Sequence, residues 1–294
     1  MTVVPVTTFG SRLAAAFDRY GQLCVGIDPH PYLLGAWGLS DDAEGLIEFG
    51  LRVIDATAGQ AGIVKPQVAF FERHGSAGVR ALEEVFSAAR AAGLLVIADA
   101  KRGDVGTSVD AYGQAWLSPG SSLEADALTV SAFQGVASLA GPMALAEASG
   151  KGLFVLAATS NPESVQTQTA VISRGPLAGR TVAAGIVAEI VENNGARHAA
   201  EAAGLGNLGV VLGATVDFAD YGIDLASLAA GGGTPVLAPG FGHQGAEFDQ
   251  LGALYGDAAR HTIVSVSRSI LAAGPAEIGA AVAHQARAVQ TWRA

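Results

Sequence analysis

Eight short apolar segments alternate with longer amphipathic segments along this chain of 294 residues. Several of the apolar segments are continuous and rich in β-branched residues, which is typical of parallel strands buried on both faces. Eight strand–helix units over this length favour the α/β class and a (β/α)8 TIM barrel, with an open doubly wound sheet as the main alternative. We expect one domain over residues 1–294. The predicted strands are residues 23–27, 62–64, 94–98, 127–130, 153–157, 209–213, 235–238 and 262–266, and amphipathic helices are predicted over 76–92, 181–192 and 276–292.

Composition and charge exclude several classes of protein. Half of the residues are hydrophobic and 15% are charged, as in a compact folded protein and not a disordered one. The formal net charge of -10 gives no support for binding to nucleic acid or to an anionic membrane. No apolar run approaches the length of about 18 residues that a membrane span needs, and residues 1–10 lack a signal-peptide pattern. Cys24 is the single cysteine, so no disulfide can form within the chain, and we expect a cytoplasmic protein.

Lysine is scarce in this chain, which has 14 Arg but only Lys65, Lys101 and Lys151 as lysines. In a (β/α)8 barrel the catalytic groups lie at the C-terminal ends of the strands. Lys65 directly follows the second predicted strand, and Lys101 lies just beyond the third. Because a random surface would rarely concentrate two of three lysines there, these positions indicate a functional site.

Two acidic residues accompany these lysines. Asp99 and Lys101 are two residues apart at the end of a predicted strand, so their side chains should lie on the same side. Asp104 follows after a turn, and Lys65 comes from the neighbouring strand. Two ammonium and two carboxylate groups would then converge on one rim, where each favours the charged form of its opposite. The alternative is an exposed loop with solvated charges, against which the scarcity of lysine argues.

A phosphate site is predicted after the seventh and eighth strands. Residues 239–245 form a glycine-rich loop that contains Gln244, and Arg268 lies between two serines where the next helix should begin. Barrels of this kind commonly bind phosphate there through backbone N–H groups and a helix N-terminus. Arg268 would add a bidentate clamp. The alternative is that the glycines provide only tight turns and that Arg268 is a surface residue.

Two other sequence patterns argue against a dinucleotide cofactor and a metal ion. Residues 204–209 fit the G-x-G-x-x-G pattern, but a helix-like segment precedes them and a strand follows. A dinucleotide fingerprint has the reverse order, so this segment is interpreted as a helix C-cap and loop. The six histidines show no metal-ligand spacing and there is no cysteine pair, so we expect neither a metal nor a cofactor.

Taken in chain order, the motifs resemble those of the orotidine 5′-phosphate decarboxylases. Residues 99–106 read D-A-K-R-G-D-V-G, which is similar to the D-x-K-x-x-D signature in the form of the subgroup often called type 2. The resemblance covers most of the chain, and it includes residues 25–29, 64–67, 158–162, 211–215, 239–245 and 267–270. The signature alone is shared with related phosphosugar decarboxylases, whereas the whole ordered set is highly specific.

The resemblance implies conversion of orotidine 5′-phosphate to UMP and CO2, the last step of de novo pyrimidine nucleotide biosynthesis, without a cofactor. It implies a homodimer in which Lys101 is the proton donor and Asp99, Lys65 and the partner subunit's Asp104 complete a charge network. It also implies the substrate contacts: ribose with Asp28, Lys65 and Ser108, pyrimidine with Ser160, and phosphate with Gln244 and Arg268. Ser108 stands where many relatives have Thr, and Ala246 stands where the lid loop often has a second Gly.

Two alternatives of different kinds remain. A metal-dependent phosphosugar decarboxylase would share the D-x-K-x-x-D element but would need strand-end acids that hold a divalent ion, and Ser160 argues against it. A catalytically silent phosphate-binding barrel could act as a sensor or scaffold. The presence of Lys101, Asp99 and Asp104 argues against that interpretation.

Overall fold

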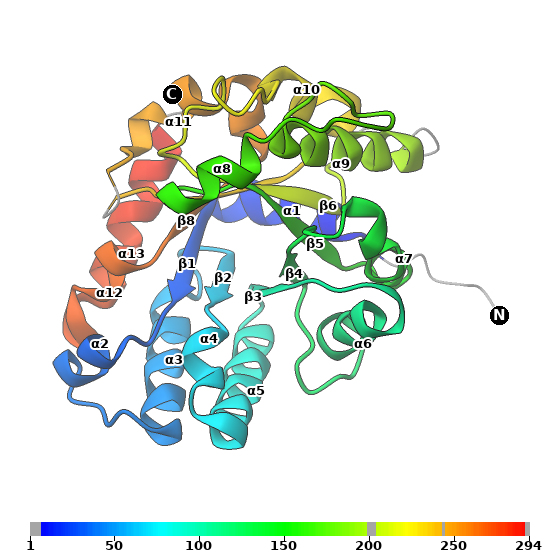
Figure 1. The fold of residues 1–294 in the computed structure, drawn as a ribbon. Coiled ribbons are helices and arrows are strands. Elements are labelled where there is room, and N and C mark those ends of the chain that lie inside the picture. Colours follow the sequence, from blue (N-terminus) through cyan, green and yellow to red (C-terminus); the bar gives the residue numbers. More distant parts are fainter. Residues whose placement is uncertain (1–6, 199–203, 243–244, 292–294) are drawn as a thin grey trace.

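Eight parallel strands close into a barrel in the computed structural model, which describes residues 7–198, 204–242 and 245–291 (Figure 1). Each strand pairs with the next, and the last returns to pair with the first. The strands are β1 (Leu23–Ile27), β2 (Ile63–Pro66), β3 (Leu95–Arg102), β4 (Ala127–Val130), β5 (Gly152–Ala158), β6 (Leu208–Leu212), β7 (Val236–Pro239) and β8 (Thr262–Val266). The predicted barrel is confirmed, and the open doubly wound sheet is wrong. The assignment of all residues 1–294 to one domain stays a prediction.

The third strand differs most from its prediction. It was expected to end at Ala98, where the apolar run ends, but β3 continues through charged residues to Arg102. The ladder with β4 passes from Ala98 opposite Leu128 directly to Arg102 opposite Val130. Three residues of β3, 99–101, therefore lie opposite the single β4 residue Thr129, and this irregularity is a β-bulge. The second strand also runs further than predicted, so Lys65 lies within β2 and not after it.

Helices surround the barrel wall (Figure 1). The predicted helices correspond to α5, α9 and α13, and their ends differ by a few residues, with α9 extending furthest beyond its prediction. The α-helices are α1 (Phe9–Tyr20), α2 (Pro31–Ala36), α3 (Ala43–Thr57), α4 (Ala69–Glu72), α5 (Gly75–Ala91), α6 (Gly106–Leu117), α7 (Ala140–Ser149), α8 (Val165–Gln168), α9 (Val182–His198), α10 (Leu225–Ala229), α11 (Leu251–Tyr255), α12 (Arg268–Leu271) and α13 (Gly274–Thr291). Short 3-10 turns are η1 (Val136–Leu139), η2 (Pro162–Ser164), η3 (Ala230–Gly232), η4 (Phe248–Gln250) and η5 (Gly256–His261). None of the helices in the described ranges is long and apolar enough to cross a membrane.

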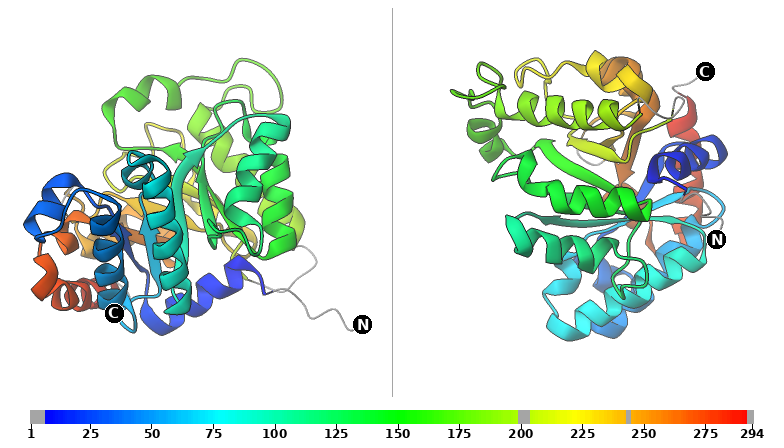
Figure 2. Two further views of the ribbon diagram at one scale, coloured as in Figure 1. Left: turned by 90° about the horizontal axis from the view of Figure 1, so that it is seen from below. Right: turned by 90° about the vertical axis from the view of Figure 1, so that its right-hand side faces the viewer.

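Helix α1 closes the end of the barrel at which the strands begin (Figure 2, left). Its buried face packs into the interior core, where Phe9 meets Phe154 edge to face with ring centroids 5.9 Å apart. A Cβ added at Gly152 would lie 2.5 Å from the Phe9 ring, so the first residue of β5 has to be small for α1 to dock. Burial raises the pKa of the Cys24 thiol to about 12, so Cys24 stays protonated and packs as a small residue of this core. The open end of the barrel is therefore the opposite one.

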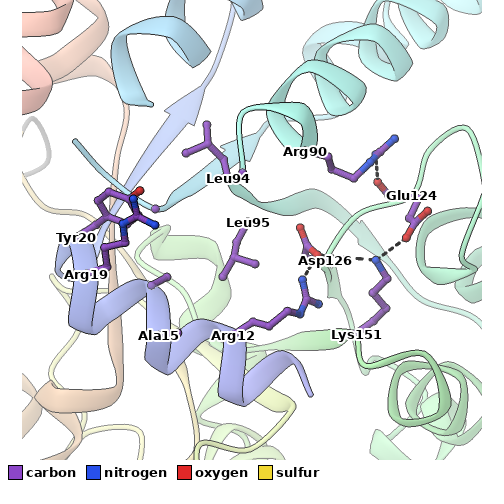
Figure 3. A pocket seen from close by; sticks show the side chains of 13 residues that line it. Arg12, Ala15, Arg19, Tyr20, Arg90, Leu94, Leu95, Glu124, Asp126 and Lys151 are labelled. Atoms are coloured by element: carbon purple, nitrogen blue, oxygen red, sulfur yellow. Dashed lines mark hydrogen bonds and ion pairs between the residues drawn. The ribbon is translucent and has the colours of Figure 1, made fainter. Parts of the chain in front are cut away.

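The third lysine, Lys151, belongs to an ion network at this closed end. A hollow of about 470 Å³ lies there (Figure 3). Lys151 Nζ is 2.7 Å from Glu124 Oε1 and 3.8 Å from Asp126 Oδ1, and Asp126 also pairs with Arg12 of α1. The second oxygen of Asp126 accepts a hydrogen bond of 2.8 Å from the backbone of Val96. Because these charged groups pair with one another and with the backbone, the network attaches α1 to the barrel.

Candidate active site

Lys65, Asp99 and Lys101 meet at the open end of the barrel. Asp99 lies between the two lysines, with Oδ2 at 2.8 Å from Lys65 Nζ and Oδ1 at 2.6 Å from Lys101 Nζ. The side chains of Lys65 and Asp99 are about nine-tenths buried, whereas that of Lys101 is 45% exposed. The structure thus brings together three of the four charged residues that were predicted to converge, and it leaves one ammonium group accessible from the barrel mouth.

Opposite charges keep the buried members of this cluster ionised. Burial by itself would raise the pKa of Asp99, but Lys65 and Lys101 outweigh it and hold that pKa well below its usual range. Burial by itself would lower the pKa of Lys65, but Asp99 and Asp28 outweigh it and raise that pKa above its ordinary value. Both groups therefore stay charged at neutral pH. Removing Asp99 would take the ion-pair partner from the buried Lys65 and from Lys101 at once, so the cluster depends on this carboxylate.

The backbone at Lys101 is strained. Its φ of 50° makes it the one non-glycine residue with positive φ in the described ranges. Such a conformation costs on the order of 1–3 kcal/mol and tends to occur at functional sites. Gln67 supports the same segment. Because Asp99 offers only acceptors, the Gln67 amide presents its nitrogen to Asp99 Oδ2 at 2.6 Å and to the Asp99 carbonyl at 3.1 Å.

Two adjoining cavities open beside the cluster, and Lys65 and Pro239 line both. The larger has a volume of about 330 Å³ and the smaller about 140 Å³. The larger is also lined by Asp99, Lys101, Thr129, Leu156, Thr159, Ser160, Asn161, Val211 and Leu237. The smaller is also lined by Asp28, Gly240, Phe241, Ser265, Ser267 and Arg268. A ligand with a flat, partly apolar end and a polar, anionic end matches this division.

Asp28 has an unsatisfied oxygen in the smaller cavity. It follows β1, and among the described residues its buried Oδ1 has no hydrogen-bond partner. A buried acceptor that lacks a partner costs about 1–3 kcal/mol, which a ligand that donates a hydrogen bond would recover. Asp28 is therefore suited to a hydroxyl donor, as was predicted for the ribose.

Arg268 lies in the wall of the smaller cavity, at the start of α12. The preceding turn is pressed against β1, because a Cβ added at Gly26 would lie 1.8 Å from Ser267 Oγ. Gly240, on the other side of the cavity, has a φ of 112°, which a larger residue would adopt only with strain. Gly26 thus lets the turn before Arg268 pack against β1, and Gly240 shapes the loop that lines the same cavity. The predicted partner of Arg268, Gln244, lies outside the described residues.

Asp104 and Ser108 do not join the site of their own chain. Asp104 Oδ1 accepts a hydrogen bond of 2.8 Å from the backbone of Val105, and within the described ranges Asp104 forms no ion pair with Lys65 or Lys101. Ser108 is exposed on the first turn of α6 and lines neither cavity. A Cβ added at Gly103 would lie 2.3 Å from the Ser131 carbonyl, so the chain turns tightly past β4 before Asp104. A single chain therefore does not bring all four predicted charges together.

Several lining residues were missed from the sequence. Leu156, Val211 and Leu237 form the apolar side of the larger cavity, and Thr129 contacts the charge cluster. The signal for Thr129 was available, since it is the one polar residue in the four-residue strand β4. The three apolar residues are ordinary members of predicted strands, and nothing in their type distinguishes a cavity wall from a core.

No group of three or more His, Cys, Asp and Glu side chains in the described part of the chain is arranged to hold a metal ion. The two carboxylates nearest the open end, Asp28 and Asp99, are each linked electrostatically to Lys65. The absence of a metal from the reaction stays a prediction.

A family model described as "Orotidine 5′-phosphate decarboxylase / HUMPS family" matches residues 21–282. The chain belongs to this family. It is 47% identical over 268 residues to the orotidine 5′-phosphate decarboxylase of Salinispora arenicola, which covers 91% of each protein. It is also 47% identical over 267 residues to that of Streptomyces coelicolor, again covering 91% of each. The predicted resemblance is confirmed, and with it the prediction that the chain is a decarboxylase of this family.

Solved structures agree with this assignment. A crystal structure of a candidate orotidine 5′-phosphate decarboxylase from Streptomyces avermitilis has a TM-score of 0.89 and 43% identity, with 99% of this chain and 98% of that chain covered. An orotidine 5′-monophosphate decarboxylase from Methanocaldococcus jannaschii, complexed with the inhibitor BMP, has a TM-score of 0.57 and 15% identity over 91% and 98% of the two chains. At that identity the second likeness supports the fold alone.

Proposed function

We propose that this family member converts orotidine 5′-phosphate to UMP and CO2, the last step of de novo pyrimidine nucleotide biosynthesis, with Lys101 as the proton donor. The observation that carries the proposal is the Lys65–Asp99–Lys101 cluster at the junction of two cavities. The close relatives bear the name of this activity. A cytoplasmic location, predicted from the sequence, is part of the proposal.

The chemistry requires a fixed positive charge at the reacting carbon. When the bond between the ring carbon and the carboxylate breaks, CO2 departs and the electron pair stays on the carbon. Lys101, held by Asp99, stabilises this pair electrostatically and then transfers one proton to it. The neutral amine of Lys101 regains a proton from solvent, which its partly exposed side chain can reach. No step needs an electron sink from a cofactor.

The two cavities suggest how the nucleotide lies. The pyrimidine occupies the larger cavity, where Ser160 lies at the rim beside the apolar side chains. Ribose hydroxyls contact Lys65, which is common to both cavities, and Asp28, whose Oδ1 has no partner in the described part of the chain and accepts a hydrogen bond. The phosphate lies at Arg268 in the smaller cavity. Gln244, which lies outside the described residues, is expected from the sequence to contact the phosphate as well. Phosphate binding remote from the reacting carbon then contributes to lowering the barrier.

The proposal includes a homodimer in which Asp104 and Ser108 enter the partner's site. Asp104 forms no ion pair with the two lysines of its own chain within the described ranges. The loops after β3 and β4 carry exposed apolar side chains, with Val105 52% exposed and Phe133 85% exposed. A two-fold interface over these loops would cover both side chains and would place the same loop of each chain at the other's site.

We expect decarboxylation to survive exhaustive chelation. Purified protein is treated with excess EDTA and dialysed, and the loss of orotidine 5′-phosphate absorbance is followed without additives. Activity should stay within about twofold of the untreated protein, and added Mg²⁺ should change it little, because the proposed steps use only ammonium and carboxylate groups. Loss of activity in EDTA and its return with a divalent metal would favour the metal-dependent alternative. No activity toward this nucleotide under any of these conditions would favour the phosphate-binding sensor.

Arg268→Ala is expected to lower kcat/KM for the nucleotide by about a hundredfold or more, equivalent to about 2.7 kcal/mol. The loss follows from removal of the phosphate contact, so the nucleoside without phosphate should be hardly affected. Steady-state kinetics on both substrates make the comparison. Arg260→Ala is the matched control, because Arg260 is exposed on η5, before β8 begins. Equal losses on both substrates would show that Arg268 acts through folding or packing.

A further inference from the structure

The β-bulge between β3 and β4 leaves the backbone N–H of one residue, Lys101, without a regular partner in the ladder. Residues 99–101 of β3 lie opposite Thr129 alone, so the backbone N–H of Lys101 cannot follow the regular ladder. Instead this N–H donates to the Thr129 hydroxyl over 3.0 Å. Thr129 is only 1% exposed, so water does not compete for this hydroxyl. A side chain of β4 therefore replaces the missing ladder acceptor at the strained residue.

The same hydroxyl also holds Asp99. Thr129 Oγ1 donates to Asp99 Oδ1 over 3.0 Å, and Oδ1 also accepts from Lys101 Nζ over 2.6 Å. Charge and distance set the direction of these bonds. An ionised carboxylate only accepts, and Asp99 Oδ1 at 3.0 Å is nearer to the hydroxyl than the competing Ala98 carbonyl at 3.5 Å. The single hydroxyl hydrogen therefore points to Asp99, and an oxygen lone pair receives the Lys101 N–H. Lys101 is thus linked to Asp99 Oδ1 directly through its ammonium group, and indirectly through its backbone N–H and the Thr129 hydroxyl.

We propose that Thr129 is a positioning residue for the proton donor. Its hydroxyl fixes the backbone conformation of Lys101 and the orientation of Asp99, so that the ammonium group approaches the reacting carbon from a set direction. Thr129 also lines the larger cavity, but its only hydrogen is already donated to Asp99 and is not available to a ligand. The inference rests on the proposed role of Lys101. Misplacement of a reacting group by about 1 Å can cost about a hundredfold in rate, which sets the scale of the expected effect.

Thr129→Val tests the inference, because it keeps the shape of the side chain and removes the hydroxyl. We expect kcat for orotidine 5′-phosphate to fall about 10- to 100-fold while KM and the dissociation constant of UMP change less than about threefold. Thr129→Ser keeps the hydroxyl and should retain kcat within about threefold. Thr262→Val is the matched control. Thr262 is buried at the start of β8, and its hydroxyl bonds the Ala258 carbonyl over 2.8 Å, far from the open end. This variant should lose stability but not kcat.

The possible outcomes separate this inference from the proposed function. If folded Thr129→Val keeps its kcat while Lys101→Ala is inactive, the positioning role is wrong and the proposed function stands. If Thr129→Ser is as slow as Thr129→Val, the side chain acts through its shape, and the inference is again wrong. If Lys101→Ala remains active, the proposed function itself fails. Should Thr129→Val not fold, Thr129→Ala also lacks the hydroxyl, and its kcat compared with that of Thr129→Ser decides the question in the same way.

Discussion

Replacing Lys101 with alanine is expected to abolish nearly all decarboxylation and to leave the fold intact. The side chain is 45% exposed, so its removal creates no core cavity, and Asp99 stays paired with Lys65. The reaction, however, loses both the charge that stabilises the carbanion and its proton source. The measurements are kcat from the decrease in substrate absorbance, and the circular dichroism spectrum and Tm of the variant. Retention of more than about a tenth of wild-type turnover, a barrier change of only about 1.4 kcal/mol, would refute the assigned role.

Lys101→Arg is the matched variant for this prediction. It keeps a positive charge beside Asp99, but a guanidinium group does not give up its proton in proteins. We expect it to be nearly as inactive as the alanine variant. Substantial activity in Lys101→Arg, with none in Lys101→Ala, would mean that this position supplies charge and that the proton comes from another group.

The sequence was sufficient to predict the barrel and the meeting of Lys65, Asp99 and Lys101 at one end of it. Each buried parallel strand appears in the sequence as an apolar run. Because all eight strands run in the same direction, the residues just beyond those runs lie at one end of the barrel. Lys65, Asp99 and Lys101 could therefore be grouped although Lys65 and Asp99 are far apart in the chain. The scarcity of lysine made that grouping more specific than the signature motif by itself.

Features that depend on pairing between strands could not be predicted in the same way. The bulge that carries Lys101 to a positive φ arises from the register of β3 against β4, which no local pattern encodes. For the same reason Thr129 was read only as a strand residue. Helix α1 was not predicted at all, and its role at the closed end depends on contacts such as Phe9 with Phe154, which are distant in sequence. The direction of Asp104 likewise follows from the turn at Gly103.

Mixing two inactive variants tests whether the site is shared. In Lys101→Ala the proton donor is missing, and in Asp104→Ala the carboxylate proposed to enter the partner's site is missing. Unlike Asp99, Asp104 forms no ion pair with either lysine of its own chain within the described ranges. The mixture therefore tests directly whether Asp104 serves the site of its own chain or that of the partner. In the proposed homodimer, each variant alone would have two defective sites. A control mixture of each variant with itself measures the background activity.

Subunit exchange between the two variants is expected to restore activity. Random reassortment makes half of the dimers mixed. In a mixed dimer one site collects both defects, and the other combines an intact Lys101 with the intact Asp104 of the opposite chain. About a quarter of all sites should therefore be native, which is the statistical result for an isologous pair. The measurement is turnover per subunit after exchange, with exchange itself verified by mass spectrometry of differently tagged chains. If exchange is complete and the mixture stays inactive, Asp104 serves its own chain, and the shared site is wrong for this protein.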